Sequence, residues 1–363
     1  MRRVARLILM LWGMGSAAAF GTVLYWIATD PAARAFRDAT LDEITATTDR
    51  MLAETATPDH LALLLVQRLD QDPRNWLALD ALMDIATQNT IPLPADLTTR
   101  FATLREADHG YLATAGSCAV CLVDSTSCTL TEVFVCQAPI NLTPIGDVLG
   151  IGKAASAYAL GNQIDTVDLA LSIVGLGATV AVLTTGGGSL VVKAGSGLMK
   201  TALKMGRVSR PLLAVFETAI LRGVNWAKLA DARSLDAVRA ALRMEHFDEV
   251  TRIANALGDV AGKTDLTTAL HLLPMVDNAT DAERLAKTAK ALGPRLLGKA
   301  EVLGKARLFR ATLRATDMAA ALLASFVAMV TALAGLAGAV VDGLIRRLLR
   351  PMTRASVKSF PIR

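Results

Sequence analysis

The sequence predicts a mainly α-helical membrane protein, with one transmembrane helix near each end and a helical extramembrane region between them. Two observations carry this prediction. Long uncharged runs lie near both termini, and apolar side chains recur at helical spacing between them. Hydrophobic residues make up 53% of the 363 residues and aromatic residues only 4%. This composition excludes a disordered or a collagen-like chain.

The N-terminal run predicts an anchor over residues 1–29. Three arginines precede 23 uncharged residues, from Leu7 to Thr29. About 20 apolar residues are enough for a helix to cross the hydrocarbon core, and flanking arginines favour a cytoplasmic end. A cleaved signal peptide is the alternative, because Ala17-Ala18-Ala19 offers a small-residue cleavage site. The apolar character continues to Ile27, so we expect an uncleaved anchor.

The C-terminal run predicts a second transmembrane helix, over residues 317–345. Met318 to Val341 is uncharged over 24 residues, and Asp342 is the last acidic residue of the chain. The basic tail 346–363 follows, with positive charges at Arg346, Arg347, Arg350, Arg354, Lys358 and Arg363. Such an excess marks a cytoplasmic end. Both termini are therefore expected in the cytoplasm, and two crossings are the simplest arrangement.

A third uncharged run, Leu169–Val192, has two interpretations. It contains five glycines, three of them consecutive at positions 186–188. Glycine weakens a helix by about 1 kcal/mol relative to alanine, so we expect a helix, a glycine turn and a second helix over about 190–205. The alternative is a true membrane span, because five basic residues follow within 193–210, as they would beside a cytoplasmic end.

All four cysteines lie within 19 residues, with the spacing C-x2-C-x6-C-x7-C: Cys118, Cys121, Cys128 and Cys136. A four-cysteine zinc site usually shows two C-x2-C pairs, and here there is one. The segment follows the first predicted span and is expected in an oxidising compartment, so two disulfides are favoured and three pairings stay open. A redox-active Cys118–Cys121 pair is the catalytic alternative, although no βαβ pattern surrounds it.

Helix-start signals recur along residues 30–112. Thr40-Leu41-Asp42-Glu43 has the pattern of a capping box and predicts a helix to about Glu54. Thr57-Pro58 and Asp72-Pro73 each place a proline in a first helical turn. Apolar residues recur at helical spacing in the two helices that follow, and again from about Ala95.

These helical hairpins resemble tetratricopeptide-type units. The resemblance rests on Asp72-Pro73-Arg74-Asn75-Trp76 and the helix after it; it covers about 50 residues, and no second copy follows 34 residues on. It implies a protein-binding surface. Helical packing without a binding role is the alternative.

The helical spacing of apolar residues fades around the cysteines and returns after them. Residues 130–135 predict one short strand, and the prolines, Asn141 and Gly146 within 139–146 predict a loop. A helix is expected from Val148 to about Leu160.

The basic half of the chain is also expected to be helical. Ser234 can cap one helix, and Thr280-Asp281-Ala282-Glu283 forms a second capping-box pattern. Gly293-Pro294 should end the helix that follows. Arg307, Arg310 and Arg314 share one helix face and predict a solvated stripe, which beside a membrane would also meet anionic headgroups.

The patterns divide the chain into seven segments. They are an N-terminal transmembrane anchor (1–29), an acidic helical-hairpin region (30–112), a four-cysteine loop segment (113–147), a hydrophobic Gly-rich hairpin that could insert into a membrane (148–210), a basic helical region (211–316), a C-terminal transmembrane helix (317–345) and a basic cytoplasmic tail (346–363).

No catalytic, metal-binding, cofactor-binding or small-molecule constellation emerges. Gly293 to Lys299 matches G-x4-G-K, but Ala300 follows where a magnesium-binding Ser or Thr is needed. The four histidines do not form H-E-x-x-H, and no G-x-S-x-G elbow occurs. The pI of about 9.1 does not predict nucleic-acid binding, because aromatics are sparse and positive charges are spread out.

The sequence therefore predicts a bacterial inner-membrane protein that is not an enzyme. Both termini should be cytoplasmic and residues 30–316 mainly periplasmic. The expected role is a scaffold, assembly or protein-interaction factor, whose partners are the lipid bilayer and other envelope proteins or a second copy of the chain. The alternative is a toxin-like or channel-like protein that uses 169–192 as a third membrane segment.

Overall fold

The chain is mainly helical, as expected from its periodicity. The computed structural model describes residues 32–109, 121, 128–130, 144–185 and 190–313. Of the two compact units, Met1–Thr312 and Leu313–Arg363, only Leu313 of the second is described, so the helices named here belong to the first. Within the described residues the β pairing is a single isolated bridge, between Val224 and Leu242.

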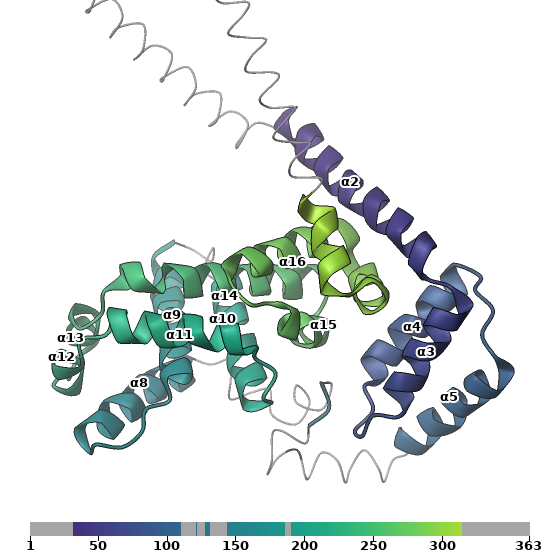
Figure 1. The fold of residues 1–363 in the computed structure, drawn as a ribbon. Helices are drawn as coiled ribbons and strands as arrows, with labels where there is room; N and C mark the ends of the chain where they lie inside the picture. Colours follow the sequence, from purple (N-terminus) through teal and green to yellow (C-terminus); the bar gives the residue numbers. More distant parts are fainter. Residues whose placement is uncertain (1–31, 110–120, 122–127, 131–143, 186–189, 314–363) are drawn as a thin grey trace, which may run out of the picture. The chain divides into compact units, whose positions relative to one another are not determined.

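Four helices form the N-terminal part (Figure 1): α2 (Ala32–Thr55), α3 (Pro58–Leu69), α4 (Trp76–Gln88) and α5 (Ala95–Asp108). Their apolar faces share one core, to which α3 contributes three leucines and α5 contributes Leu97 and Phe101. The predicted helix start at Thr57-Pro58 is confirmed, because the Thr57 hydroxyl accepts a hydrogen bond from the backbone N–H of His60.

Two predicted helix starts in this part are wrong. Thr40 lies inside α2, which already begins at Ala32, so no free N-terminus exists there for a capping box to satisfy. Asp72-Pro73 lies in the connection before α4. The N-cap of α4 is Asn75, whose side chain accepts a hydrogen bond from the N–H of Ala78.

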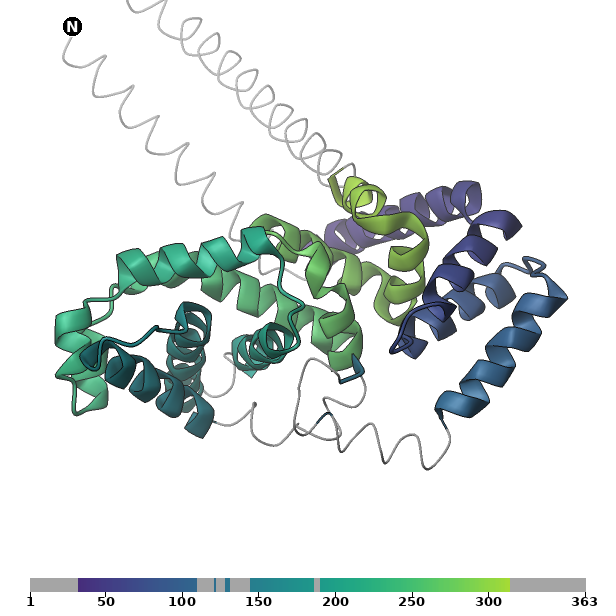
Figure 2. The same cartoon turned by 60° about the horizontal axis from the view of Figure 1, so that its bottom comes forward.

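A helical bundle follows (Figures 1 and 2), with α8 (Pro144–Ala159), α9 (Thr166–Thr185), α10 (Leu190–Lys204) and α11 (Arg210–Gly223) as its first members. Its further elements are α12 (Trp226–Ala230), α13 (Leu235–Ala240), η2 (Met244–Phe247), α14 (Asp248–Lys263), α15 (Leu266–Leu272), η3 (Leu273–Met275), α16 (Ala279–Leu292) and η4 (Gly293–Arg295). Residues 296–312 are helical and are called the terminal helix. The bundle has a core of its own.

Two separate helices are found in this run, as expected, since α9 ends at Thr185 and α10 begins at Leu190; the glycines between them lie outside the described residues. The side chains of residues 169–174 are buried. Among the described residues, no helix combines the length and the apolar character needed to cross a bilayer. The predicted transmembrane segments 1–29 and 317–345, and the tail 346–363, lie outside the described residues.

Other boundaries differ from expectation by a few residues. Pro144 and Gly146, expected in a loop, belong to α8, and Leu130, expected in a strand, is helical. Residues 131–143 lie outside the described part of the chain. Ser234 caps α13 as predicted. The cap of α16 is Asn278 rather than Thr280, and the helix ends at Leu292, directly before Gly293.

The predicted arginine stripe is exposed where the structure describes it. Arg307 and Arg310 are both solvent-exposed on the terminal helix, whereas Arg314 lies outside the described residues. Arg307 is also anchored, because its guanidinium donates a 2.7 Å hydrogen bond to the hydroxyl of Thr55 at the end of α2.

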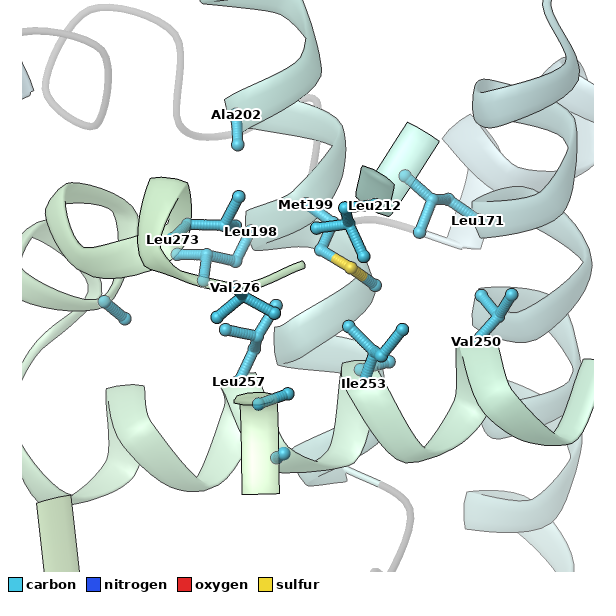
Figure 3. Close-up of a cluster of buried hydrophobic side chains, with 14 of the residues drawn as sticks. Leu171, Leu198, Met199, Ala202, Leu212, Val250, Ile253, Leu257, Leu273 and Val276 are labelled. Atoms are coloured by element: carbon cyan, nitrogen blue, oxygen red, sulfur yellow. The ribbon is translucent and has the colours of Figure 1, made fainter. Parts of the chain in front are cut away.

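Helices α10 and α14 approach each other closely at two glycines. A Cβ atom added to Gly195 would lie 1.7 Å from the backbone oxygen of Ala254, and one added to Gly258 would lie 2.0 Å from that of Val191. Only a residue without a side chain allows such an approach. Leu198 and Met199 of α10 then meet Ile253 and Leu257 of α14 in one buried cluster (Figure 3).

Replacing Gly258 with alanine should therefore destabilise the bundle, by roughly 1–3 kcal/mol, because its methyl group would collide with the backbone of α10. The matched control is G262A on the same helix, where nothing lies within 4 Å of an added Cβ atom. It should leave stability unchanged or raise it by up to about 1 kcal/mol. Chemical denaturation would measure both, and equal effects of the two variants would contradict the close contact.

Candidate functional site

A buried polar network joins the N-terminal helices to the bundle. Its centre is the carboxylate of Glu301 on the terminal helix. The Nε2 atom of His271 on α15 lies 2.6 Å from Glu301 Oε1, and the side chains of both residues are at most 4% exposed. Arg68 of α3 donates two hydrogen bonds to Glu301 Oε2, from Nε at 3.0 Å and from Nη2 at 2.7 Å.

Asn75 completes the network and fixes the orientation of the histidine. Its Oδ1 atom accepts a hydrogen bond from the N–H of Ala78 as the cap of α4, so its Nδ2 amide is left to donate to Nδ1 of His271, at 2.9 Å. Because Nδ1 accepts, the imidazole proton is on Nε2 and points to Glu301. The hydrogen bonds thus fit a histidine that donates its Nε2–H to the carboxylate of Glu301.

The environment keeps Glu301 ionised. Burial by itself raises the pKa of this carboxyl group, but the hydrogen bond from His271 together with the charge and hydrogen bonds of Arg68 outweighs it, so the pKa lies below its usual range. Both carboxylate oxygens are occupied by donors from other helices. The network therefore joins α3, α4 and α15 to the terminal helix.

Two lysines attach the terminal helix to its neighbours through further ion pairs. Lys299, which is 2% exposed, lies 2.6 Å from Asp49 of α2 and donates to the hydroxyl of Thr48; burial lowers the pKa of its amine. Lys305 lies 2.7 Å from Asp281 of α16 and also pairs with Asp277. These contacts raise the pKa of Lys305 despite its partial burial.

The enclosure of His271 and Glu301 decides what this network can do. A general acid or base must come within hydrogen-bond reach of a substrate. Here the ring nitrogens of His271 are both engaged by protein atoms, and neither side chain is more than 4% exposed. The arrangement therefore fits a structural role, in which the network holds neighbouring helices together. Among the described residues, no group of three or more His, Cys, Asp or Glu side chains could hold a metal ion.

The sequence singled out the cysteines, and two of them can be placed. Cys121 and Cys128 form a disulfide and are buried, at 0% and 5% exposure, within the core of the bundle. This pairing selects one of the three connectivities and does not use the C-x2-C pair Cys118–Cys121. Cys118 and Cys136 lie outside the described residues.

The sequence did not single out the network around Glu301. One signal was available, since His271 interrupts the apolar run Ala269–Leu273 and a polar residue there must find a partner when buried. Nothing local identifies that partner, because Glu301 and Arg68 are 30 and 203 residues away in the chain.

Comparison with known proteins adds no identity: no family model, curated protein or solved structure matches this chain.

Replacing Glu301 with glutamine should destabilise the protein by about 3–5 kcal/mol, because it leaves Arg68 partly buried without its counter-charge. The matched control is E283Q, which breaks the exposed pair between Glu283 and Arg252 and should cost at most about 1 kcal/mol. Equilibrium unfolding would measure both. A similar small loss for the two variants would contradict the structural role of Glu301.

The wild-type protein should also lose stability in acid through this group. Because the pKa of Glu301 is lowered on folding, its stabilisation is fully present above the pKa of the unfolded chain, about 4.3 for a glutamate, and is lost as pH falls below that value towards the folded pKa. Unfolding measured across this window should show a shallower decline for E301Q than for the wild type. Parallel curves would exclude Glu301 as a source of the acid sensitivity.

Removing the disulfide with the C121S/C128S double variant should cost roughly 2–3 kcal/mol, since it releases a short loop in the unfolded chain. Alkylation of the unfolded, unreduced wild type followed by peptide mapping should leave Cys121 and Cys128 unlabelled. Labelling of either thiol without reductant would contradict the pairing.

Proposed function

We propose that the chain is a non-enzymatic scaffold or assembly factor of the bacterial inner membrane, which holds a helical binding surface in the periplasm. In this proposal residues 1–29 and 317–345 are the two anchors, both termini are cytoplasmic and residues 30–316 are mainly periplasmic. Its partners are the bilayer and other envelope proteins, or a second copy of the chain. The sequence patterns at both ends motivate the topology.

The observation that carries the binding role is the array of α3, α4 and α5, which the Glu301 network attaches to the bundle through α3 and α4. Helices held in this way present a pre-formed surface, which reduces the entropy lost on binding. Helical-hairpin arrays of the tetratricopeptide type bind proteins, and this part of the chain resembles them.

The charge on this array indicates the partner's chemistry. Its arginines Arg68, Arg74, Arg100 and Arg105 are all engaged in ion pairs with described carboxylates. Five exposed acidic side chains have no ion pair within the described residues: Asp59, Asp72, Asp84, Asp96 and Glu106. A partner with a basic surface would therefore gain favourable electrostatics, mainly in its rate of association.

Two observations support the remaining parts of the proposal. A disulfide buried in the core, Cys121–Cys128, is favoured in an oxidising compartment such as the periplasm. The apolar run at 169–174 packs inside the bundle, which favours the scaffold over the alternative of a membrane-inserting hairpin.

Site-specific photocrosslinking of the full-length chain in membranes of its own bacterium would test the binding role. The probe would replace Leu63, an exposed residue of α3, and the control probe would replace Leu221, an exposed residue of α11. We expect one discrete protein adduct from position 63, weakened at least several-fold when Asp59 and Asp84 are changed to lysine. Identical adducts from both positions, or none, would contradict a surface on α3–α5.

The topology has its own test. A cysteine placed at Leu221, which is 75% exposed, should react with a membrane-impermeant maleimide added outside the inner membrane. Protection until the membrane is opened would place this region in the cytoplasm. Recovery of the full-length chain in the soluble fraction after simple lysis would remove the anchors from the proposal.

A further inference from the structure

Exposed charges of opposite sign are separated along the chain. Five exposed acidic side chains of the α3–α5 array have no ion pair within the described residues, whereas every arginine of that array is paired. Exposed basic side chains that lack an ion pair in the part of the chain that the structure describes gather on α14, α16, η4 and the terminal helix: Lys263, Lys287, Arg295 and Arg310. These four residues are called the basic group.

The carboxylates close to the basic group in the chain are already engaged. Every carboxylate of residues 259–301 has a partner of its own: Asp259, Asp265, Asp277, Asp281, Glu283 and Glu301. Five of them contact a lysine, an arginine or a histidine, and Asp265 uses both oxygens to hold Thr268 at the start of α15. The positive charges of the basic group therefore remain available to another molecule.

The bundle between these two regions does not separate its charges in this way. On α11 the exposed side chains include both Glu217 and Arg222, and on α13 they include both Asp236 and Arg239. Interspersed signs of this kind are ordinary for a protein surface and favour no particular partner. The surfaces of one sign are the array on one side and the basic group on the other.

The elements that carry the basic group pack against one another. Helices α14 and α16 lie side by side (Figures 1 and 2). The backbone oxygen of Lys263, at the end of α14, lies 3.9 Å from the position of a Cβ atom on Gly293, two residues before Arg295. Lys305 returns the terminal helix to the start of α16 through its 2.7 Å contact with Asp281. The positive charges thus stand on one packed set of helices, so their fields reinforce one another.

We propose that the basic group of one copy docks on the acidic α3–α5 array of a second copy. This inference rests on the proposed function and names its partner: the protein with the basic surface is the chain itself. Neither set of charges is paired within the described part of one copy, and contact between copies brings opposite signs together. Two different surfaces meet in such a contact, so it is heterologous and can continue from copy to copy as a ring or a row. Copies anchored as proposed share one membrane, which raises their effective concentration.

The adduct formed by a photoprobe at the exposed Leu63 would identify the partner. The experiment uses two differently tagged copies of the full-length chain in membranes of their own bacterium. We expect an adduct that carries both tags, with the crosslinked peptide of the second copy within residues 263–310. An adduct with a different protein would overturn this inference and leave the proposed function standing, whereas the absence of any adduct would overturn both.

Reversal of the charges gives the sharper comparison. The variants D59K/D84K and K287E/R310E each bring like charges together, which costs binding energy. Each alone should lower the self-association constant of the detergent-solubilised full-length chain at least about tenfold, measured by sedimentation velocity at low salt. A mixture of the two variants should associate again, because the first keeps its basic group and the second keeps its array. Recovery in the mixture would also show that both variants are folded.

The matched control is R222E/R239E, which reverses two exposed positive charges in the region of mixed sign and should associate like the wild type. Unchanged self-association in either test variant, no recovery in the mixture, or an equal loss in the control would overturn the proposal. So would self-association that disappears when phosphatidylglycerol replaces neutral lipid in the micelles, because the basic group would then bind anionic headgroups instead.

Discussion

The carboxylate of Glu301 is the constraint on which the arrangement of the helices depends. It is buried and ionised, so it is tolerated only where donors surround it, and those donors come from α3 and α15. Asn75 connects α4 to the same network, because its side-chain amide both caps that helix and donates a hydrogen bond to His271. Buried ion pairs do not always stabilise a protein. The Glu301 carboxylate, however, has its hydrogen-bond donors only when α3, α15 and the terminal helix are packed together.

The terminal helix connects the two cores through charge and through shape. Lys299 contacts α2, and Glu301 contacts both α3 and α15. Lys305 contacts α16 and the segment before it. Between them Gly298 lets the helix approach α4, where an added Cβ atom would lie 2.9 Å from the backbone oxygen of Ala81. The N-terminal array is thus held by directional contacts, which gives a binding surface on α3–α5 a fixed geometry.

Several local features could be predicted because their causes are local. Thr57 and Ser234 cap helices through bonds to residues three positions ahead, and the glycine-rich run correctly predicted two helices, α9 and α10, in place of one. The same rules failed at Thr40 and Thr280. Both have the cap pattern, yet each lies in a helix that begins earlier, because residues before them are also compatible with a helix. A capping pattern identifies a possible helix start and does not exclude a better one nearby.

The sequence by itself determined the helical class, the positions of α13 and α16 in the basic half and the presence of cysteines that can pair, because these follow from spacing within a few residues. Only the tertiary structure decided that Cys121 pairs with Cys128, that His271 and Arg68 both meet Glu301, and that Lys299 pairs with Asp49. Those contacts join residues as far apart in the chain as Asp49 and Lys299. They form only after the helices have packed, when burial makes each unpaired charge costly enough to select one arrangement.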